Sequence, residues 1–327
     1  MDTSNYRVPK YLSPSGLACW EKSPEEYFLR YIAPEDVRPE RPPQTDPMSV
    51  GSAFDALVKA DIYKDFYGLS KANEEGYLIR DLVNVQCEEH TLPESLVIAC
   101  ELFEQYRETG ALADIKAAIR RHTQYPRMEF TVVETIEGVP LLGKPDLHYG
   151  DIIADWKVSG SVSKRGVSPQ QGYQIARDIH GSRTNGESHK RYEPKQHSTG
   201  EEVSGYTMDK TTDYWADQLS TYAWCLGHRV GSEGWVARIE QIACRPCPPK
   251  DESGVIRAKC CTHQTTVAQN HQLQLIERYK RCWWHVSNRH YFPDCDALTS
   301  DARANAIVHD LTPATELTLD TLPEINW

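Results

Sequence analysis

Three charged side chains near the middle of the chain have a spacing suited to metal-assisted chemistry. Asp146 comes just before a predicted β-hairpin, and Asp155 and Lys157 lie in its second strand. Gly150-Asp151 is a favourable two-residue hairpin turn. Pairing the strands outward from this turn sets Asp146 opposite Asp155. Because side chains alternate along a strand, Lys157 shares the face of Asp155, whereas Trp156 points away.

Two carboxylates directly across a β-ladder repel each other, and this destabilises a sheet. A divalent cation between Asp146 and Asp155 reverses the effect, because carboxylate oxygens suit Mg²⁺ and Mn²⁺. The alternative is structural: Asp146 lies on the hairpin surface, and Asp155 and Lys157 form a solvated charge pair. Asp-x-Lys triplets are common by chance, which favours this alternative. The apolar run 152–154 favours the metal site, since it predicts that the second strand is half buried.

The hairpin resembles the active-site hairpin of the PD-(D/E)XK nuclease superfamily, with Pro145-Asp146 followed by Asp155-Trp156-Lys157. Further segments resemble motifs of its RecB-like and phage exonuclease-like branch, in the same order. They are an opening helix at 12–31, a Gly-x-x-x-His helix with Asp55 in place of the His, Glu129 on the strand before the hairpin, and a Gln-x-x-x-Tyr helix with Gln218 and Tyr222. The match spans roughly residues 12–285 and is sparse.

The resemblance implies an α/β fold with a restriction-endonuclease-like core, in which helices flank a central mixed β-sheet. It also implies a metal-dependent DNA nuclease. Mg²⁺ or Mn²⁺ would be held by Asp146, Asp155 and the main-chain carbonyl of Trp156. Asp55 or Glu129 would complete this site or help to hold a second ion.

Three other side chains receive roles from the same resemblance. Lys157 would orient the attacking water, help to deprotonate it, or stabilise the transition state. Gln218 and Tyr222 would position the hairpin or the DNA backbone. An exonuclease in recombination, repair or phage DNA metabolism is the first expectation, and a structure-specific endonuclease is the second.

Other classes of protein stay open. The chain could be a nucleic-acid-binding protein with a silent nuclease site, or a hydrolase of another phosphate ester. The sequence contains no Gly-x-x-x-x-Gly-Lys-Ser/Thr loop, so any unwinding or strand annealing would come from a separate helicase or annealing protein.

The charge distribution bears on the DNA partner. The chain carries a net charge of −11, but residues 157–197 hold eight Lys and Arg against three Asp and Glu, a net +5. The segment is predicted to be a long loop that contacts the phosphate backbone, and a solvated insertion is the alternative. The candidate DNA contacts are Lys164, Arg165, Arg177, Arg183, Lys190 and Arg191.

The ten cysteines are scattered, which favours a reducing, cytoplasmic compartment. Cys244 and Cys247 have zinc-knuckle spacing, with Cys260, Cys261 and His263 nearby, but the adjacent cysteines disfavour one zinc site. Some relatives carry an iron–sulfur cluster whose first cysteine lies in a Cys-Pro of the opening helix. Such a cluster is disfavoured here, because that position reads Ser23-Pro24.

The 327 residues are expected to form one nuclease domain, 1–295, and an acidic tail, 296–327, without a signal peptide or membrane span. The domain divides into a mainly helical part at 1–127, the catalytic hairpin region at 128–158, a basic insertion at 159–212 and a helix-strand-strand-helix part at 213–295. Helices are predicted at 12–32, 49–63, most of 70–122, 212–226 and 270–286, and strands at 128–136, 139–149, 152–158, 235–244 and 255–267.

Overall fold

The computed structural model describes residues 6–122, 125–159, 174–178, 195–198, 207–244 and 258–312. Five of the candidate DNA contacts lie outside these residues, as does Cys247; the five are Lys164, Arg165, Arg183, Lys190 and Arg191. Arg177 lies in a described strand, but its side chain is not described.

The chain divides into two compact units. The first comprises Met1–Arg41, Thr135–Leu141 and Ile276–Trp327, and the second comprises Pro42–Glu134 and Leu142–Leu275. The boundaries pass through strands β2 (Val132–Ile136) and β3 (Val139–Gly143) and through helix α9 (Gln269–Ser287). The domain boundaries expected from the sequence stay a prediction.

A seven-stranded mixed sheet forms the centre of the second unit, in the order β1-β4-β5-β8-β9-β6-β7. Only β5 and β8 are parallel neighbours, and every other adjacent pair is antiparallel. The strands are β1 (Arg127–Met128), β4 (Leu147–Tyr149), β5 (Ile152–Ser159), β6 (Gln174–Asp178), β7 (Lys195–Ser198), β8 (Val236–Cys244) and β9 (Ala258–Thr265). The predicted α/β fold with a mixed sheet flanked by helices is confirmed.

The predicted hairpin register between β4 and β5 is also confirmed. Leu147 pairs with Ala154, and Tyr149 pairs with Ile152 next to the turn. Gly150 adopts a positive φ of 55°, which a two-residue hairpin turn commonly requires. Asp146 and Asp155 therefore lie one position beyond the last ladder pair.

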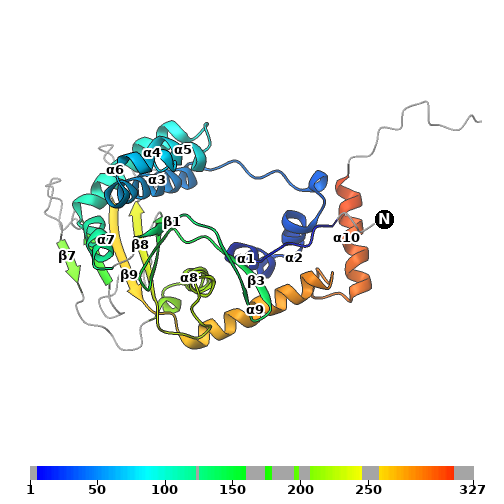
Figure 1. Cartoon of the computed structure of the whole chain (residues 1–327). Coiled ribbons are helices and arrows are strands. Elements are labelled where there is room, and N and C mark those ends of the chain that lie inside the picture. The colour runs from blue at the N-terminus through cyan, green and yellow to red at the C-terminus, as the bar shows by residue number, and fades with distance from the viewer. Residues whose placement is uncertain are drawn as a thin grey trace, which may run out of the picture. The chain divides into compact units, whose positions relative to one another are not determined.

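Helices cover both faces of this sheet, as Figure 1 shows for α3 and α6 on one face and α8 on the other. The first face packs against α3 (Asp46–Tyr67), α5 (Ile79–Gln86), α6 (Leu92–Glu108) and α7 (Ala111–Arg120). The second packs against α8 (Asp213–Cys225). Alternation along β5 explains the division: Ala154 and Trp156 belong to the first core, and Ile153 belongs to the second.

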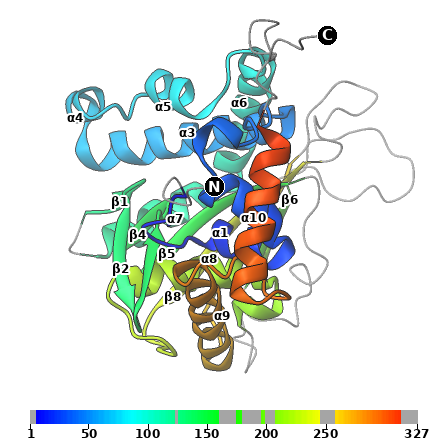
Figure 2. The same cartoon turned by 90° about the vertical axis from the view of Figure 1, so that its right-hand side faces the viewer.

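The first unit is built from helices near both ends of the chain (Figure 2). They are α1 (Pro14–Lys22), α2 (Pro24–Tyr27), a π-helical turn (Phe28–Ile32), a 3₁₀ turn (Glu35–Val37) and α10 (Ala297–Leu311). The rings of Phe28 and Tyr291 lie 5.1 Å apart, and Arg303 on α10 pairs with Glu25 on α2. The sequence analysis missed α10, whose first turn is capped by Asp296.

Local backbone chemistry explains where the predicted elements are interrupted. The opening helix breaks at Ser23, which is extended and caps α2 through its side chain. The strand expected at 128–136 divides into β1 and β2, because Glu129 adopts a left-handed φ of 49°. The strand expected at 139–149 divides at Pro145, which has no backbone N–H to donate to a ladder.

Two other predictions about the elements need correction. Part of the expected long loop is strand, since β6 and β7 belong to the central sheet. Helix α3 extends beyond the predicted range at both ends and stops before Gly68. The short elements α4 (Leu69–Glu74) and a 3₁₀ turn (Met208–Lys210) complete the described secondary structure. In the part of the chain that the structure describes, no helix has the length and apolar character needed to cross a bilayer.

Candidate metal centre

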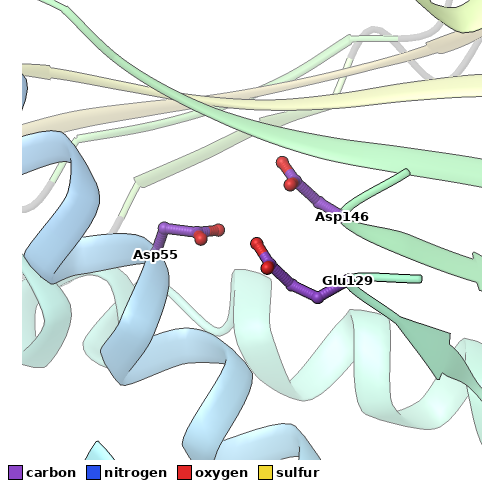
Figure 3. Close-up of side chains that lie close together, drawn as sticks. All are labelled: Asp55, Glu129 and Asp146. Atoms are coloured by element: carbon purple, nitrogen blue, oxygen red, sulfur yellow. The ribbon is translucent and has the colours of Figure 1, made fainter. Parts of the chain in front are cut away.

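Three carboxylates converge from separate elements of the second unit. Asp55 lies on α3, Glu129 directly follows β1, and Asp146 directly precedes β4. One ligand oxygen from each lies within 4.8 Å of the others. Figure 3 shows the three side chains pointing toward one another. The structure thus brings together three residues that the sequence analysis named as metal ligands.

The backbone around Glu129 contributes to this convergence. Glu129 is one of three non-glycine residues with positive φ among those described, and its N–H donates a 3.4 Å hydrogen bond to the Asp146 carbonyl. A left-handed conformation is costly for such a residue and persists only where its surroundings enforce it. Here it turns the chain out of β1 at the position from which the side chain reaches the cluster.

Lys59 lies at the centre of the three carboxylates, and the sequence analysis missed it. Its side chain is 0% exposed. Its Nζ lies 2.5 Å from Oε1 of Glu129 and 3.0 Å from Oδ1 of Asp146, and it also donates to Oδ2 of Asp55. A signal was present, because Asp55 and Lys59 are four residues apart on one helix and such pairs lie on one face.

A second polar group lies at the β5 side of the centre. The Lys157 ammonium is 2.6 Å from Oδ1 of Asp155 and donates a 3.0 Å hydrogen bond to Oε1 of Gln218. The Gln218 amide in turn donates to Oδ2 of Asp155 at 2.8 Å. Asp155, Lys157 and Gln218 therefore form a closed triangle of hydrogen bonds and charge, with Asp155 almost fully buried.

Tyr222 extends this group along α8, where it follows Gln218 by one turn. The Gln218 amide also lies 2.8 Å from the Tyr222 hydroxyl oxygen. A Cβ atom at Gly143 would lie 3.0 Å from Cδ1 of Tyr222. The tyrosine ring is therefore packed closely against the backbone of β3. Glycine at this position leaves room for the ring.

Trp156 faces the opposite side of the sheet, as predicted. Its indole nitrogen donates a 3.3 Å hydrogen bond to the Tyr106 hydroxyl of α6. This contact fixes the orientation of β5, so that its neighbours in sequence, Asp155 and Lys157, face α8. The role expected for the Trp156 carbonyl stays a prediction.

Burial and mutual repulsion raise the pKa of two of the carboxyl groups. Burial raises the pKa of Asp55 to about 7, against the lowering effect of Lys59. Burial also raises the pKa of Asp155 to about 7, and the charge of Asp146 adds to the rise. Protons therefore compete for these two groups near neutral pH.

The other two carboxyl groups behave in the opposite way. Burial tends to raise the pKa of Glu129 and of Asp146, but the nearby ammonium groups together outweigh it and lower both values: Lys59 at both residues, with Lys157 at Asp146. Lys144 adds to the effect at Glu129, where its Nζ lies 2.9 Å from Oε2. Glu129 and Asp146 are therefore ionised at neutral pH.

Lys59 and Lys157 both remain charged. Burial lowers the pKa of Lys59 and of Lys157, but the neighbouring carboxylates more than compensate and raise both values. With Lys144, three ammonium groups then face four carboxyl groups: Asp55, Glu129, Asp146 and Asp155. When all of these groups are ionised, the centre keeps one excess negative charge.

The donor set fits a hard divalent cation. Its ligand atoms are all carboxylate oxygens, which suit Mg²⁺ or Mn²⁺. Oδ1 of Asp55 is buried, and no described residue donates a hydrogen bond to it. A buried acceptor without a partner is costly, and coordination of a cation would satisfy it.

The cysteine site is not tested by the structure, because Cys247 and the Cys261 side chain fall outside the description. Cys260 is buried. Burial lowers the pKa of His263 to about 4, and its Nε2 lies 3.3 Å from Oε1 of Gln241. His263 is therefore neutral and already paired within the sheet.

Comparison with protein-family models and with curated proteins finds no significant match. Among solved structures, the chain is similar to the crystal structure of a "putative exonuclease" from Eubacterium rectale. The two share 15% identity, the alignment covers 90% of this chain and 88% of the other, and the TM-score is 0.39. At these values, the function has to be inferred from the site itself.

Proposed function

We propose that the chain is a metal-dependent nuclease that hydrolyses phosphodiester bonds in DNA. The proposal rests on two groups of side chains that lie side by side. Asp55, Glu129 and Asp146 offer converging carboxylate oxygens. Asp155 and Lys157 lie beside them on the strand that pairs with β4. An acidic cation site with an ammonium next to it suits hydrolysis of an anionic backbone.

The ligands of the cation would come from Asp146 and Asp155, completed by Asp55, Glu129 and the Trp156 carbonyl. A divalent ion bound there would neutralise charge on the scissile phosphate and lower the pKa of a bound water. Lys144 pairs with Glu129, its Nζ lying 2.9 Å from Oε2, and this contact restricts the position of the carboxylate. Such fixed donors and charges cost no reorganisation during reaction.

Lys157 is suited to act on the phosphate or on the attacking water. Its side chain is 25% exposed, whereas that of Lys59 is fully buried. Asp155 and Gln218 hold the ammonium from two directions and restrict its motion. Gln218 and Tyr222 are positioning residues in this proposal, because their contacts lead to Asp155 and Lys157.

The resemblance of the hairpin and its ordered motifs favours the PD-(D/E)XK superfamily and its RecB-like and phage exonuclease-like branch. We therefore propose an exonuclease, with a structure-specific endonuclease as the alternative mode. Lys164, Arg165, Arg177, Arg183, Lys190 and Arg191 are proposed to contact the phosphate backbone. A separate annealing protein or helicase would supply any strand exchange or unwinding.

One observation favours a second candidate, a DNA-binding protein whose nuclease site is silent. The Lys59 ammonium already contacts all three carboxylates of the cluster. If Lys59 excluded metal permanently, DNA binding would persist without cleavage. The two candidates make opposite predictions for metal-dependent cleavage.

A digestion time course separates these candidates. End-labelled linear duplex, single-stranded DNA and a closed circle are each incubated with Mg²⁺ or Mn²⁺, and matched reactions contain EDTA. We expect loss of the linear substrates only, and only with metal. Cutting of the circle would assign an endonuclease. DNA binding without cleavage of any substrate would overturn the nuclease proposal in favour of the silent site.

A further inference from the structure

Lys59 is a buried cation for which the proposed hydrolysis provides no task. A buried ammonium without partners is strongly unfavourable, so its position depends on acidic neighbours. Each of the three N–H donors of this ammonium has a carboxylate acceptor: Oδ2 of Asp55, Oε1 of Glu129 and Oδ1 of Asp146. No solvent reaches the side chain.

We propose that Lys59 is a tethered cation that occupies the carboxylate cluster in the metal-free protein, so that a divalent ion binds there in competition with it. The proposal deepens the proposed function, because it rests on the same metal site. It concerns the competition between Lys59 and a divalent ion for the carboxylates of that site.

Shared ligands are the first argument for competition. The residues whose oxygens lie within 4.8 Å of one another are the same three that accept hydrogen bonds from Lys59. An ammonium and a divalent ion within one such cluster repel each other at short range. A metal ion that draws on these three side chains must therefore displace the lysine head group or weaken its contacts.

The unpartnered oxygen of Asp55 is the second argument. Lys59 bonds Oδ2, whereas Oδ1 is buried and receives no hydrogen bond from the described part of the chain. The ammonium has no donor left for it. An ammonium can serve three acceptors, whereas a divalent ion coordinates a larger number of oxygen ligands. A divalent ion can therefore bind Oδ1 of Asp55, which Lys59 leaves without a hydrogen bond.

The side chain of lysine also permits withdrawal. Its ammonium is a compact charge on a flexible four-carbon stem, so the head group can move while α3 stays in place. In the metal-free state, the tethered cation reduces repulsion among the carboxylates and keeps them at the centre. The cost is lower metal affinity, so the site fills only at higher metal concentration.

The test measures Mn²⁺ binding without DNA, by calorimetry on EDTA-stripped and dialysed protein. Wild type is compared with Lys59→Met, which removes the charge and keeps an unbranched stem. Lys116→Met is the matched control, because Lys116 on α7 also pairs with two aspartates, at 2.6 Å from Asp61 and 3.4 Å from Asp65, outside the centre.

We expect Lys59→Met to bind Mn²⁺ at least about tenfold more tightly than wild type, because the competing cation is gone. Its melting temperature without metal should fall, since the carboxylates lose their counter-ion. Its rise in melting temperature on metal addition should exceed that of wild type. Lys116→Met should match the wild-type affinity.

Equal or weaker Mn²⁺ affinity in Lys59→Met would overturn the competition and leave the nuclease proposal intact. Absence of Mn²⁺ binding in both proteins would overturn the metal site and the nuclease proposal together. If Lys59→Met is unfolded without metal, recovery of the fold on Mn²⁺ addition supports competition. Failure to recover with millimolar Mn²⁺ overturns it, because a metal ion then cannot replace the ammonium.

Discussion

The side-chain amide of Gln218 on α8 donates a 2.8 Å hydrogen bond to Oδ2 of Asp155 on β5. Its carbonyl oxygen accepts a hydrogen bond from the Lys157 ammonium. One side chain from a neighbouring helix thus holds the acidic and the basic member of the strand motif. This relationship gives Gln218 a positioning role that can be measured separately from metal binding.

Substitution Gln218→Ala should lower kcat by about ten- to a hundredfold, because small displacements of reacting groups cost this much. The affinity for Mn²⁺ should change less, since Gln218 offers no carboxylate to the metal. Steady-state kinetics and calorimetry on the same preparation check the expectation. Gln241→Ala, which alters an amide on β8, is the comparison. Unchanged kcat in Gln218→Ala would contradict the positioning role.

Substitution Gly143→Ala should destabilise the protein by about 1–3 kcal/mol, because the new Cβ overpacks the site. It would lie 3.0 Å from Cδ1 of Tyr222 and 3.4 Å from its Cα. Gly51→Ala on α3 is the control, since its nearest new contact is 3.9 Å and alanine favours the helix. Urea unfolding compares the two variants. Equal stability of the two proteins would show that the ring moves freely aside.

The elevated pKa values of Asp55 and Asp155 predict how stability depends on pH without metal. Both are about 7 in the folded protein and about 4 in an unfolded chain. Between about pH 4 and pH 7, the folded state binds more protons than the unfolded state. The free energy of unfolding should therefore fall as pH rises through this range. Each group contributes a slope of up to about 1.4 kcal/mol per pH unit.

Urea unfolding in EDTA at several pH values tests this slope. Asp155→Asn should show a shallower fall than wild type, because one titrating group is removed. Glu129 and Asp146, whose pKa values are lowered, contribute stability above about pH 4 that is lost on acidification below it. Identical slopes in wild type and Asp155→Asn would contradict the elevated pKa of Asp155.

Metal binding should depend on pH in the opposite sense. Mn²⁺ requires ionised carboxylates, so its affinity should increase as pH rises through about 7 and level off above it. Calorimetry in buffers with different ionisation enthalpies would also register the released protons. An affinity that is constant from pH 6 to pH 8 would show that Asp55 and Asp155 do not take part.

The sequence predicted the hairpin well because its determinants are local. Gly150-Asp151 sets the turn, and the turn sets the register of Leu147 with Ala154. The same reasoning failed at Glu129, because its left-handed φ depends on contacts outside the segment. Helix α10 was missed because the acidic, threonine-containing composition of the tail concealed a capped helix.

The candidate site was predicted only in part from local spacing. Asp55, Glu129 and Asp146 come from distant segments, and only the resemblance placed them together before their geometry was known. Lys59 was not identified from the sequence, because a lysine on a helix usually faces solvent. Its burial depends on three carboxylate partners that the tertiary fold brings to it. The partners of such a buried charge come from distant segments, so local spacing does not predict them.

The most direct test of the central claim is the Mg²⁺-dependent cleavage rate of Asp146→Asn. The variant keeps the size of the side chain but removes the negative charge of Asp146, which contacts Lys59 and lies opposite Asp155. Asp65→Asn, which removes a carboxylate elsewhere on α3, is the control. We predict that Asp146→Asn loses at least about a hundredfold in rate while Asp65→Asn retains it. Cleavage by Asp146→Asn at the wild-type rate would contradict the assignment of this centre as a nuclease site.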